Sequence, residues 1–133
     1  MKTKLILLLF LSISTSIYAQ KIKLKKETIY IDGIPVLSYE KKSYGNEFVI
    51  YELNTKNELI TDVYNVHGDY QKIIFTNQQK SMEMRPAYWN KSLIKWFIEQ
   101  GLLDIKGNFN ADKVDSFIEK FDEKITERTI LKN

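Results

Sequence analysis

The sequence contains no cysteine and a single histidine, and among its 133 residues there are only two prolines and five glycines. The absence of cysteine excludes disulfide cross-links and any zinc or iron–sulfur site that needs thiolate ligands. A single histidine excludes catalytic sets that need two imidazoles. Because 44% of the residues are apolar and 28% are charged, the composition is that of a globular protein and not of a collagenous or disordered one.

The first nineteen residues differ in character from the rest of the chain. Two lysines precede an unbroken apolar run of seven residues at 5–11, and a serine-rich stretch leads to Ala19 and Gln20. This is the layout of a secretory signal peptide that is cleaved between Ala19 and Gln20. Such a run is too short to cross a bilayer, which takes about 20 apolar residues, so we expect no transmembrane anchor after cleavage. Residues 1–19 are therefore expected to direct export to the periplasm or the medium.

Loss of that segment changes the charge balance. It contains two lysines and no acidic residue, so the formal charge falls from +3 to +1 for the mature chain of residues 20–133. Nucleic-acid-binding domains carry a strong surplus of lysine and arginine on one face, and the only arginines here are Arg85 and Arg128. We therefore expect no nucleic-acid partner and, in the absence of cysteine, a single domain stabilised by a packed core.

An antiparallel β-meander of about five to six strands is predicted for residues 27–85, where short β-rich runs alternate with turn residues. The dipeptide Asp32-Gly33 favours a type I′ turn in which Ile29 faces Val36. The lysine-rich segment 20–26 has its apolar residues out of phase with this hairpin, so we interpret it as a solvated N-terminal arm. Contact of these lysines with an anionic surface, such as acidic lipid, is the alternative.

The dipeptide Gly68-Asp69 predicts a second tight hairpin, with a type II′ turn that pairs His67 with Tyr70. In this register Asp62 lies on the apolar face of the sheet, among isoleucine, tyrosine and phenylalanine side chains. A carboxylate in such a place is suited to general acid or base chemistry. Asp62 is therefore the candidate residue if the protein is an enzyme.

Residues 86–130 are predicted to form two helices that pack on one face of the sheet, which completes a domain of the α+β class. The first helix spans 91–100, with Asn90 as N-cap and Gly101 at the C′ position. Its apolar residues cover a wide arc, so we expect it to pack on two neighbours, the sheet and the last helix. The second helix begins after the N-cap Asn110 and continues through an apolar stripe formed by Val114, Phe117, Ile118, Phe121 and Ile125.

Signature motifs of catalysis and cofactor binding are missing from the sequence. The glycines form neither a phosphate-binding nor a dinucleotide-binding loop, and there is no nucleophile elbow. Residues 104–115 partly imitate a calcium-binding EF-hand loop, but Lys106, Phe109 and Asp115 depart from its pattern. We therefore expect no metal, no cofactor and no catalytic set.

The remaining candidates for ligand binding are aromatic and titratable side chains. Tyrosine gives a large contact area at a small entropic cost, so an exposed group of Tyr39, Tyr44 and Tyr51 is a candidate platform. Asp62 is a candidate as the inward carboxylate, and His67 as the one imidazole, placed at a hairpin tip. The alternative for each is structural, because tyrosines suit a half-buried sheet and a histidine at a hairpin tip is usually solvated.

Three motifs in fixed order along the chain carry a resemblance. They are Tyr18-Ala19-Gln20 at the end of the signal, Ile31-Asp32-Gly33-Ile34-Pro35-Val36 in the first hairpin, and Gly101-Leu102-Leu103-Asp104 between the two helices. In this layout the chain resembles small exported uncharacterised proteins of Bacteroidota. Such proteins have no settled activity, so the resemblance implies export and implies no site residues.

The sequence favours an exported, non-catalytic binding or structural protein of the cell envelope or the secreted fraction, with a protein or a small apolar molecule as partner. An inhibitor or immunity-type partner of an exported enzyme or toxin is the alternative within the binding class. A small carboxylate-dependent hydrolase or isomerase built on Asp62 is the alternative of another class. The ligand, the oligomeric state and the sheet face that the helices cover stay open at this point.

Overall fold

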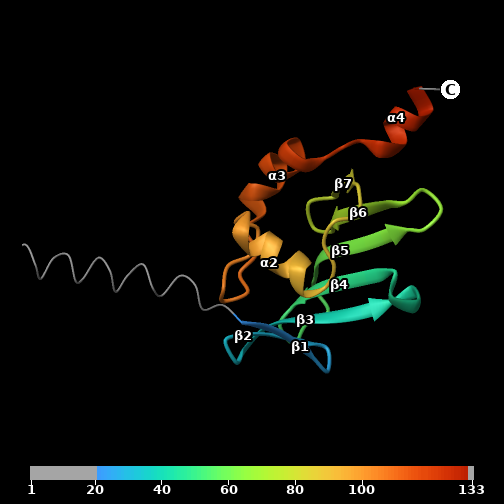
Figure 1. The fold of residues 1–133 in the computed structure, drawn as a ribbon. Helices are drawn as coiled ribbons and strands as arrows, with labels where there is room; N and C mark the ends of the chain where they lie inside the picture. The colour runs from blue at the N-terminus through green and yellow to red at the C-terminus, as the bar shows by residue number, and fades with distance from the viewer. Residues whose placement is uncertain (1–20, 132–133) are drawn as a thin grey trace, which may run out of the picture.

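The computed structural model describes residues 21–131, so the expected signal peptide at 1–19 lies outside the described residues. Seven antiparallel strands form one sheet in which each strand pairs with its neighbours in sequence, and the C-terminal helices pack against it (Figure 1). The strands are β1 (Ile22–Lys25), β2 (Thr28–Ile31), β3 (Ile34–Lys42), β4 (Glu47–Glu52), β5 (Glu58–Asn65), β6 (Tyr70–Phe75) and β7 (Lys80–Met84). The helices are α2 (Lys91–Glu99), α3 (Val114–Phe121) and α4 (Ile125–Leu131), with short 3-10 turns η1 (Ser43–Gly45) and η2 (Ala111–Lys113). The predicted α+β meander with C-terminal helices is confirmed. The sheet has seven strands, whereas five to six were expected.

The core lies between one face of the sheet and helices α2 and α3. Side chains alternate between the two faces of a strand, and those facing the helices include Ile60 and Ile73, both 0% exposed. We call this the inner face and the opposite side the outer face. Trp96 of α2 stacks on Tyr88 with 4.5 Å between ring centroids and contacts Phe117 of α3 at 4.9 Å. Helix α2 thus packs on the sheet and on the following helix, as its wide apolar arc predicts.

The lysine-rich N-terminal segment is strand β1 of the sheet, so the expectation of a solvated arm is wrong. A two-residue turn at Lys26 and Glu27, which both have positive φ (49° and 65°), joins it to β2. A two-residue hairpin pairs even-numbered with odd-numbered positions, and Ile22 accordingly faces Ile31. Both of these side chains pack with the core. The apolar residues of β1 are even-numbered and those of β2 are odd-numbered because the two strands form a two-residue hairpin.

The hairpin between β2 and β3 has the predicted turn but a different register. The turn residues Asp32-Gly33 have φ values of 51° and 81°, as a type I′ turn requires. A β-bulge then places Ile29 opposite Leu37, so the predicted pairing of Ile29 with Val36 is wrong. Pro35 lies beside the bulge, where a residue without an N–H is tolerated because the ladder is already interrupted.

The hairpin between β5 and β6 has a four-residue loop at 66–69 instead of the predicted two-residue turn, so Asn65 and not His67 pairs with Tyr70. The Asn65 side chain stabilises the wider loop, because its Oδ1 accepts a hydrogen bond from the amide of the third loop residue (2.8 Å). The register differs from the prediction by two residues, which leaves the side chains of β5 and β6 on their predicted faces. Asp62 therefore lies on the inner face, as predicted. Val66, predicted on the apolar face, lies in the loop and is exposed.

Helix α2 begins at Lys91 as predicted and ends at Glu99, one residue early, with Gly101 at the C′ position; its N-terminal cap differs from the prediction. Gly101 has φ +79°, and the amide of Leu102 donates to the carbonyl of Phe97 (2.9 Å), a bond of the Schellman motif. Asn90 makes no side-chain capping bond, because its backbone (φ 52°, ψ −112°) lies outside the extended region that an N-cap adopts. The hydroxyl of Ser92 instead accepts a hydrogen bond from the backbone amide of Trp89 (2.9 Å).

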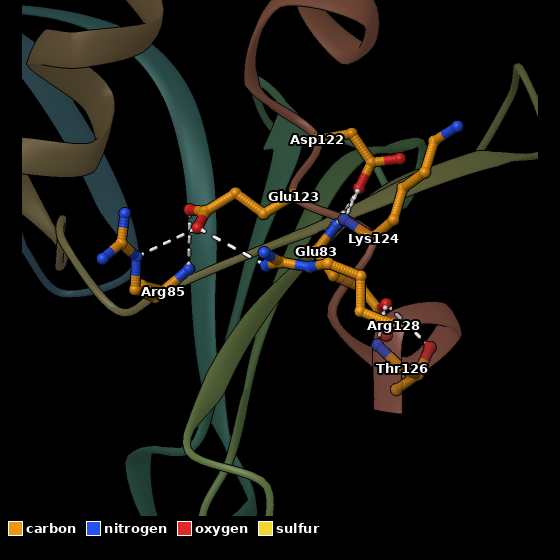
Figure 2. A network of polar contacts seen from close by, with 7 residues as sticks. All are labelled: Glu83, Arg85, Asp122, Glu123, Lys124, Thr126 and Arg128. Carbon is orange, nitrogen blue, oxygen red and sulfur yellow. Dashed lines mark hydrogen bonds and ion pairs between the residues drawn. The ribbon is translucent and has the colours of Figure 1, made fainter. Parts of the chain in front are cut away.

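The predicted last helix is interrupted. Asn110 caps its start as predicted, since its side chain accepts from the amide of Asp112 (3.2 Å). However, α3 ends at Phe121, Lys124 has φ +49°, and α4 begins at Ile125. Between the two helices the chain runs beside β7 (Figure 2). Within residues 21–131, no helix combines the length and the apolarity needed to span a membrane.

The interruption of the helix lets residues 122–126 lie along the free edge of β7, where they form hydrogen bonds with backbone groups of that edge. The amide of Glu83 donates to the Asp122 carboxylate (3.0 Å), and its carbonyl accepts from the Glu123 amide (2.7 Å). The two carboxylate oxygens of Glu123 accept from the amide and the Nε of Arg85, both at 3.0 Å (Figure 2). An unpaired sheet edge recruits other strands. This segment, which we call the C-terminal strap, closes one edge of the sheet.

Candidate functional site

The outer face of the sheet, opposite the helices, carries two adjacent hollows. The polar hollow has a volume of about 410 Å³ and is lined by Lys26, Glu27, Thr28, Ser38, Tyr39, Glu40, Tyr51, Asn54, Thr55 and Lys56. The lysine hollow has a volume of about 440 Å³ and is lined by Lys21, Lys23, Lys25, Tyr30 and Gly33. Lys25 and Thr28 are cross-strand partners and each lines one hollow, so the two hollows meet at the β1–β2 turn.

Tyr51 organises the polar hollow. Its side chain is buried (5% exposed), and Lys56 Nζ lies 5.9 Å from its ring centroid and 3.6 Å from the Glu40 carboxylate. Burial raises the pKa of the Tyr51 hydroxyl, and its interaction with Glu40 raises it further. The interaction with Tyr51 also raises the pKa of the Lys42 ammonium group. The raised pKa keeps the Tyr51 hydroxyl neutral at pH 7. With Glu40 and Lys56 beside it, the polar hollow offers donors and acceptors suited to hydrogen-bonding a polar ligand.

The lysine hollow forms because side chains along β1 alternate between the two faces of the sheet. The two apolar residues that separate Lys21, Lys23 and Lys25 pack against the core, so the three lysines lie on the outer face. All three are exposed, and within residues 21–131 none of them forms an ion pair. The carboxylate of Asp32 accepts a hydrogen bond from the backbone amide of Lys21 (2.8 Å) and not from its side chain. The hollow itself has no acidic residue in its lining.

Asp62 is a buried carboxyl group (3% exposed) on the inner face. Its Oδ1 accepts a hydrogen bond from Gln71 Nε2 (2.8 Å), which also donates to the carbonyl of Tyr88 (2.8 Å). The side-chain Oε1 of Gln71 accepts from the backbone amide of Ala87 (3.2 Å). Burial raises the pKa of Asp62 from 3.8 to about 7, although the hydrogen bond from Gln71 lowers it in part. The pair ties β5 and β6 to the segment before α2, and Asp62 lines neither of the two outer hollows.

The structure does not bring the three candidate tyrosines together. Tyr39 stacks on Phe48, with ring centroids 5.4 Å apart, and belongs to the inner face, whereas Tyr51 belongs to the outer face. Both border the polar hollow. Tyr44 is fully exposed in η1, where it has φ +57°, and His67 is exposed in the β5–β6 loop. Neither Tyr44 nor His67 lines one of the two hollows.

The part of the chain from 21 to 131 contains no group of three or more acidic or histidine side chains placed to hold a metal ion. The loop that imitates an EF-hand is closed by its own hydrogen bonds, since Asp104 Oδ1 accepts from the amides of Lys106 and Asn108, both at 2.9 Å. Partial burial opposes ionisation of Asp104, but the hydrogen bonds from Asn108 and Lys106 lower its pKa.

Comparison with protein-family models, with curated proteins and with solved structures found no match. The candidate site therefore rests on the chain's own geometry. The sequence singled out the lysines of segment 20–26 as an alternative contact for an anionic surface, but interpretation of the segment as a solvated arm did not place Lys21, Lys23 and Lys25 on one face of the sheet. Sequence reasoning missed the contact between Glu40 and Lys56, because that contact depends on how β3 pairs with β4 and on the turn that follows β4.

Proposed function

We propose that this protein is an exported, non-catalytic binding protein that recognises its ligand on the outer face of the sheet. The polar hollow is the observation that carries this proposal. Its volume of about 410 Å³ is in the range of small-molecule sites, and polar groups of Tyr51, Glu40 and Lys56 gather there. Export rests on the signal-like layout of residues 1–19.

The lining of the polar hollow favours a polar ligand over the small apolar molecule that the sequence suggested. An apolar ligand would strip water from the Glu40 and Lys56 charges without replacing their hydrogen bonds, which is unfavourable. A molecule with both donors and acceptors would replace them. The placement of Asp62 supports binding over hydrolysis or isomerisation, because this carboxyl lies on the inner face and is engaged by Gln71.

The test uses two tryptophan variants of the outer face. Thr28→Trp places a large ring in the polar hollow. Lys72→Trp is the control, because it places the same ring on β6, and Lys72 is half-buried like Thr28. The processed protein, purified after export, is immobilised and exposed to a small-molecule extract of the envelope, and retained compounds are identified by mass spectrometry. We expect the wild type and Lys72→Trp to retain the same compound and Thr28→Trp to retain it about ten-fold less, a loss of about 1.4 kcal/mol of binding free energy.

Equal retention by Thr28→Trp and the wild type, or no retained compound at all, would overturn the proposal. The melting temperature of each variant shows whether the fold is intact. If a retained compound is chemically converted, and if Asp62→Asn stops the conversion without a change in melting temperature, the enzyme alternative replaces the binding function.

A further inference from the structure

Strand β1 forms one edge of the sheet and pairs only with β2. Hydrogen-bonded and non-hydrogen-bonded pairs alternate along an antiparallel ladder. The amide of Asp32 donates to the carbonyl of Lys21 (2.9 Å), so the lysine positions of β1 are the ones that are bonded to β2. The N–H and C=O groups of Ile22 and Leu24 therefore point away from β2, towards the free edge.

This edge is open to a further strand. Within residues 21–131, no hydrogen bond engages the outward backbone groups of Ile22 and Leu24. Buried backbone groups are nearly always paired, so these groups face water. Helix α2 contacts β1, but the side chains of Ile22 and Leu24 are only half-buried, whereas those of Ile29 and Ile31 on β2 are buried. The C-terminal strap closes the β7 edge (Figure 2), and no segment in the described part of the chain does the same for β1.

The side chains of β1 determine which strand can be added. Lys21, Lys23 and Lys25 are exposed on the outer face, about 7 Å apart along the strand as alternate residues are. Residues of an added antiparallel strand would face these lysines in non-hydrogen-bonded pairs, in which the side chains are closest. A second copy of β1 would place lysine opposite lysine, which is destabilising, whereas acidic residues in the same positions are stabilising.

We propose that the β1 edge binds an extended acidic segment of a partner protein by strand addition. The segment has acidic residues at every second position, opposite the lysines, and apolar residues between them that cover the half-buried Ile22 and Leu24. An acidic segment already has this role at the other edge of the sheet, where Asp122 and Glu123 accept hydrogen bonds from backbone amides. Docking at β1 needs no ligand in the polar hollow.

Binding of a synthetic peptide tests the proposal. The probe is a fluorescent, terminally blocked peptide of about eight residues, near the usual length of a strand, in which glutamate and valine alternate. Its control has the same composition, with all glutamates in one block. The processed protein is titrated into each peptide at physiological ionic strength, and binding is followed by fluorescence anisotropy. We expect the alternating peptide to bind and the block peptide to bind several-fold more weakly.

Amide hydrogen exchange, followed by NMR, locates the bound peptide. The amides of Ile22 and Leu24 have no partner among residues 21–131 and are expected to exchange more slowly when the alternating peptide is bound. The amide of Lys23 faces β2 and serves as the internal reference. A peptide held only by charge would leave all three amides unchanged.

Matched lysine variants test the charge pattern. Because a cross-strand pair of opposite charges contributes about two- to three-fold in affinity, the triple variant Lys21→Gln, Lys23→Gln, Lys25→Gln is expected to bind the alternating peptide on the order of ten-fold more weakly. The control triple variant has the same net charge and changes exposed lysines of β3, η2 and α3; it is Lys41→Gln, Lys113→Gln, Lys120→Gln. We expect the control to keep most of the binding.

A second pair of variants tests the backbone of the edge. Leu24→Pro removes the amide that faces the free edge, a substitution that edge strands tolerate, and Leu24→Ala shortens the same side chain but keeps the amide. We expect Leu24→Pro to bind about five-fold more weakly than Leu24→Ala, the loss of one hydrogen bond. Melting temperatures show whether each variant folds. If Leu24→Pro does not fold, the lysine variants and the amide exchange decide.

Three results would overturn the proposal. They are absence of binding of the alternating peptide, binding that leaves exchange at Ile22 and Leu24 unchanged, and equal loss in the two triple variants. The first result, combined with larger oligomers of the Lys21, Lys23 and Lys25 variant in light scattering, would show that the lysines only keep copies of this edge apart. None of these results alters the retention test of the polar hollow.

Discussion

The buried carboxyl of Asp62 makes the stability of this protein depend on pH in an unusual direction. Its pKa is raised from 3.8 to about 7, so between these values the folded protein keeps a proton that the unfolded chain releases. The contribution of Asp62 to stability is therefore fully present below pH 4 and is lost as the pH rises towards 7. Each pKa unit corresponds to 1.36 kcal/mol, so the loss amounts to about 4 kcal/mol.

The substitution Asp62→Asn isolates this effect. Asparagine keeps the oxygen that accepts the hydrogen bond from Gln71 and cannot ionise. We expect the free energy of unfolding, measured by urea titration at intervals of pH, to diverge between the two proteins, with the variant gaining about 4 kcal/mol relative to the wild type from pH 4 to pH 7. The other titratable groups are common to both proteins and cancel in the difference. Parallel curves across this range would refute the assignment of a protonated Asp62 to the folded state.

Further substitutions test the packing, each by urea unfolding. Gly107→Ala is expected to lower the free energy of unfolding by about 2 to 4 kcal/mol. The new Cβ would lie 2.2 Å from a β3 carbonyl oxygen, and the backbone there has φ +83°. Gly45→Ala is the control for backbone strain alone, because Gly45 has φ +90° and its Cβ would have no atom within 4 Å. Asp122→Ala leaves the amide of Glu83 without its acceptor and is expected to cost about 1 to 2 kcal/mol, with larger oligomers in light scattering. Trp96→Ala removes the centre of the aromatic cluster and is expected to cost about 3 to 5 kcal/mol. A cost below about 1 kcal/mol for Gly107→Ala or Trp96→Ala, or an unchanged oligomeric state for Asp122→Ala, would contradict these assignments.

The alternation of apolar residues was enough to predict the meander and the inward side of Asp62, because side-chain direction depends only on odd or even position. Exact pairing was harder to predict. It depends on loop length, and the loop at 66–69 is stabilised by a hydrogen bond from the Gly68 amide to the Asn65 side chain, which has no signal in the apolar pattern. A two-residue error left the faces correct for the same reason of parity. The sheet face to which a side chain belongs is therefore easier to predict than its cross-strand partner.

The candidate site was predicted less well than the fold, since its residues are brought together by pairing. Lys21, Lys23 and Lys25 become one surface only when β1 joins the sheet, and a segment interpreted as a solvated arm has no fixed face. Glu40 and Lys56 are likewise distant in sequence and meet beside Tyr51. The tyrosines were chosen by residue type, which does not report the face of the sheet to which each belongs.

The C-terminal strap also sets an order of events during folding. Each strand pairs with the one before it, so the sheet can grow hairpin by hairpin as the chain becomes available, and such local pairing favours rapid folding. The β7 edge is the exception, because it waits for residues 122–126. In that interval the amides of Glu83 and Arg85 are open to a strand of another copy. We therefore expect association through the β7 edge during folding to depend on how fast the strap docks.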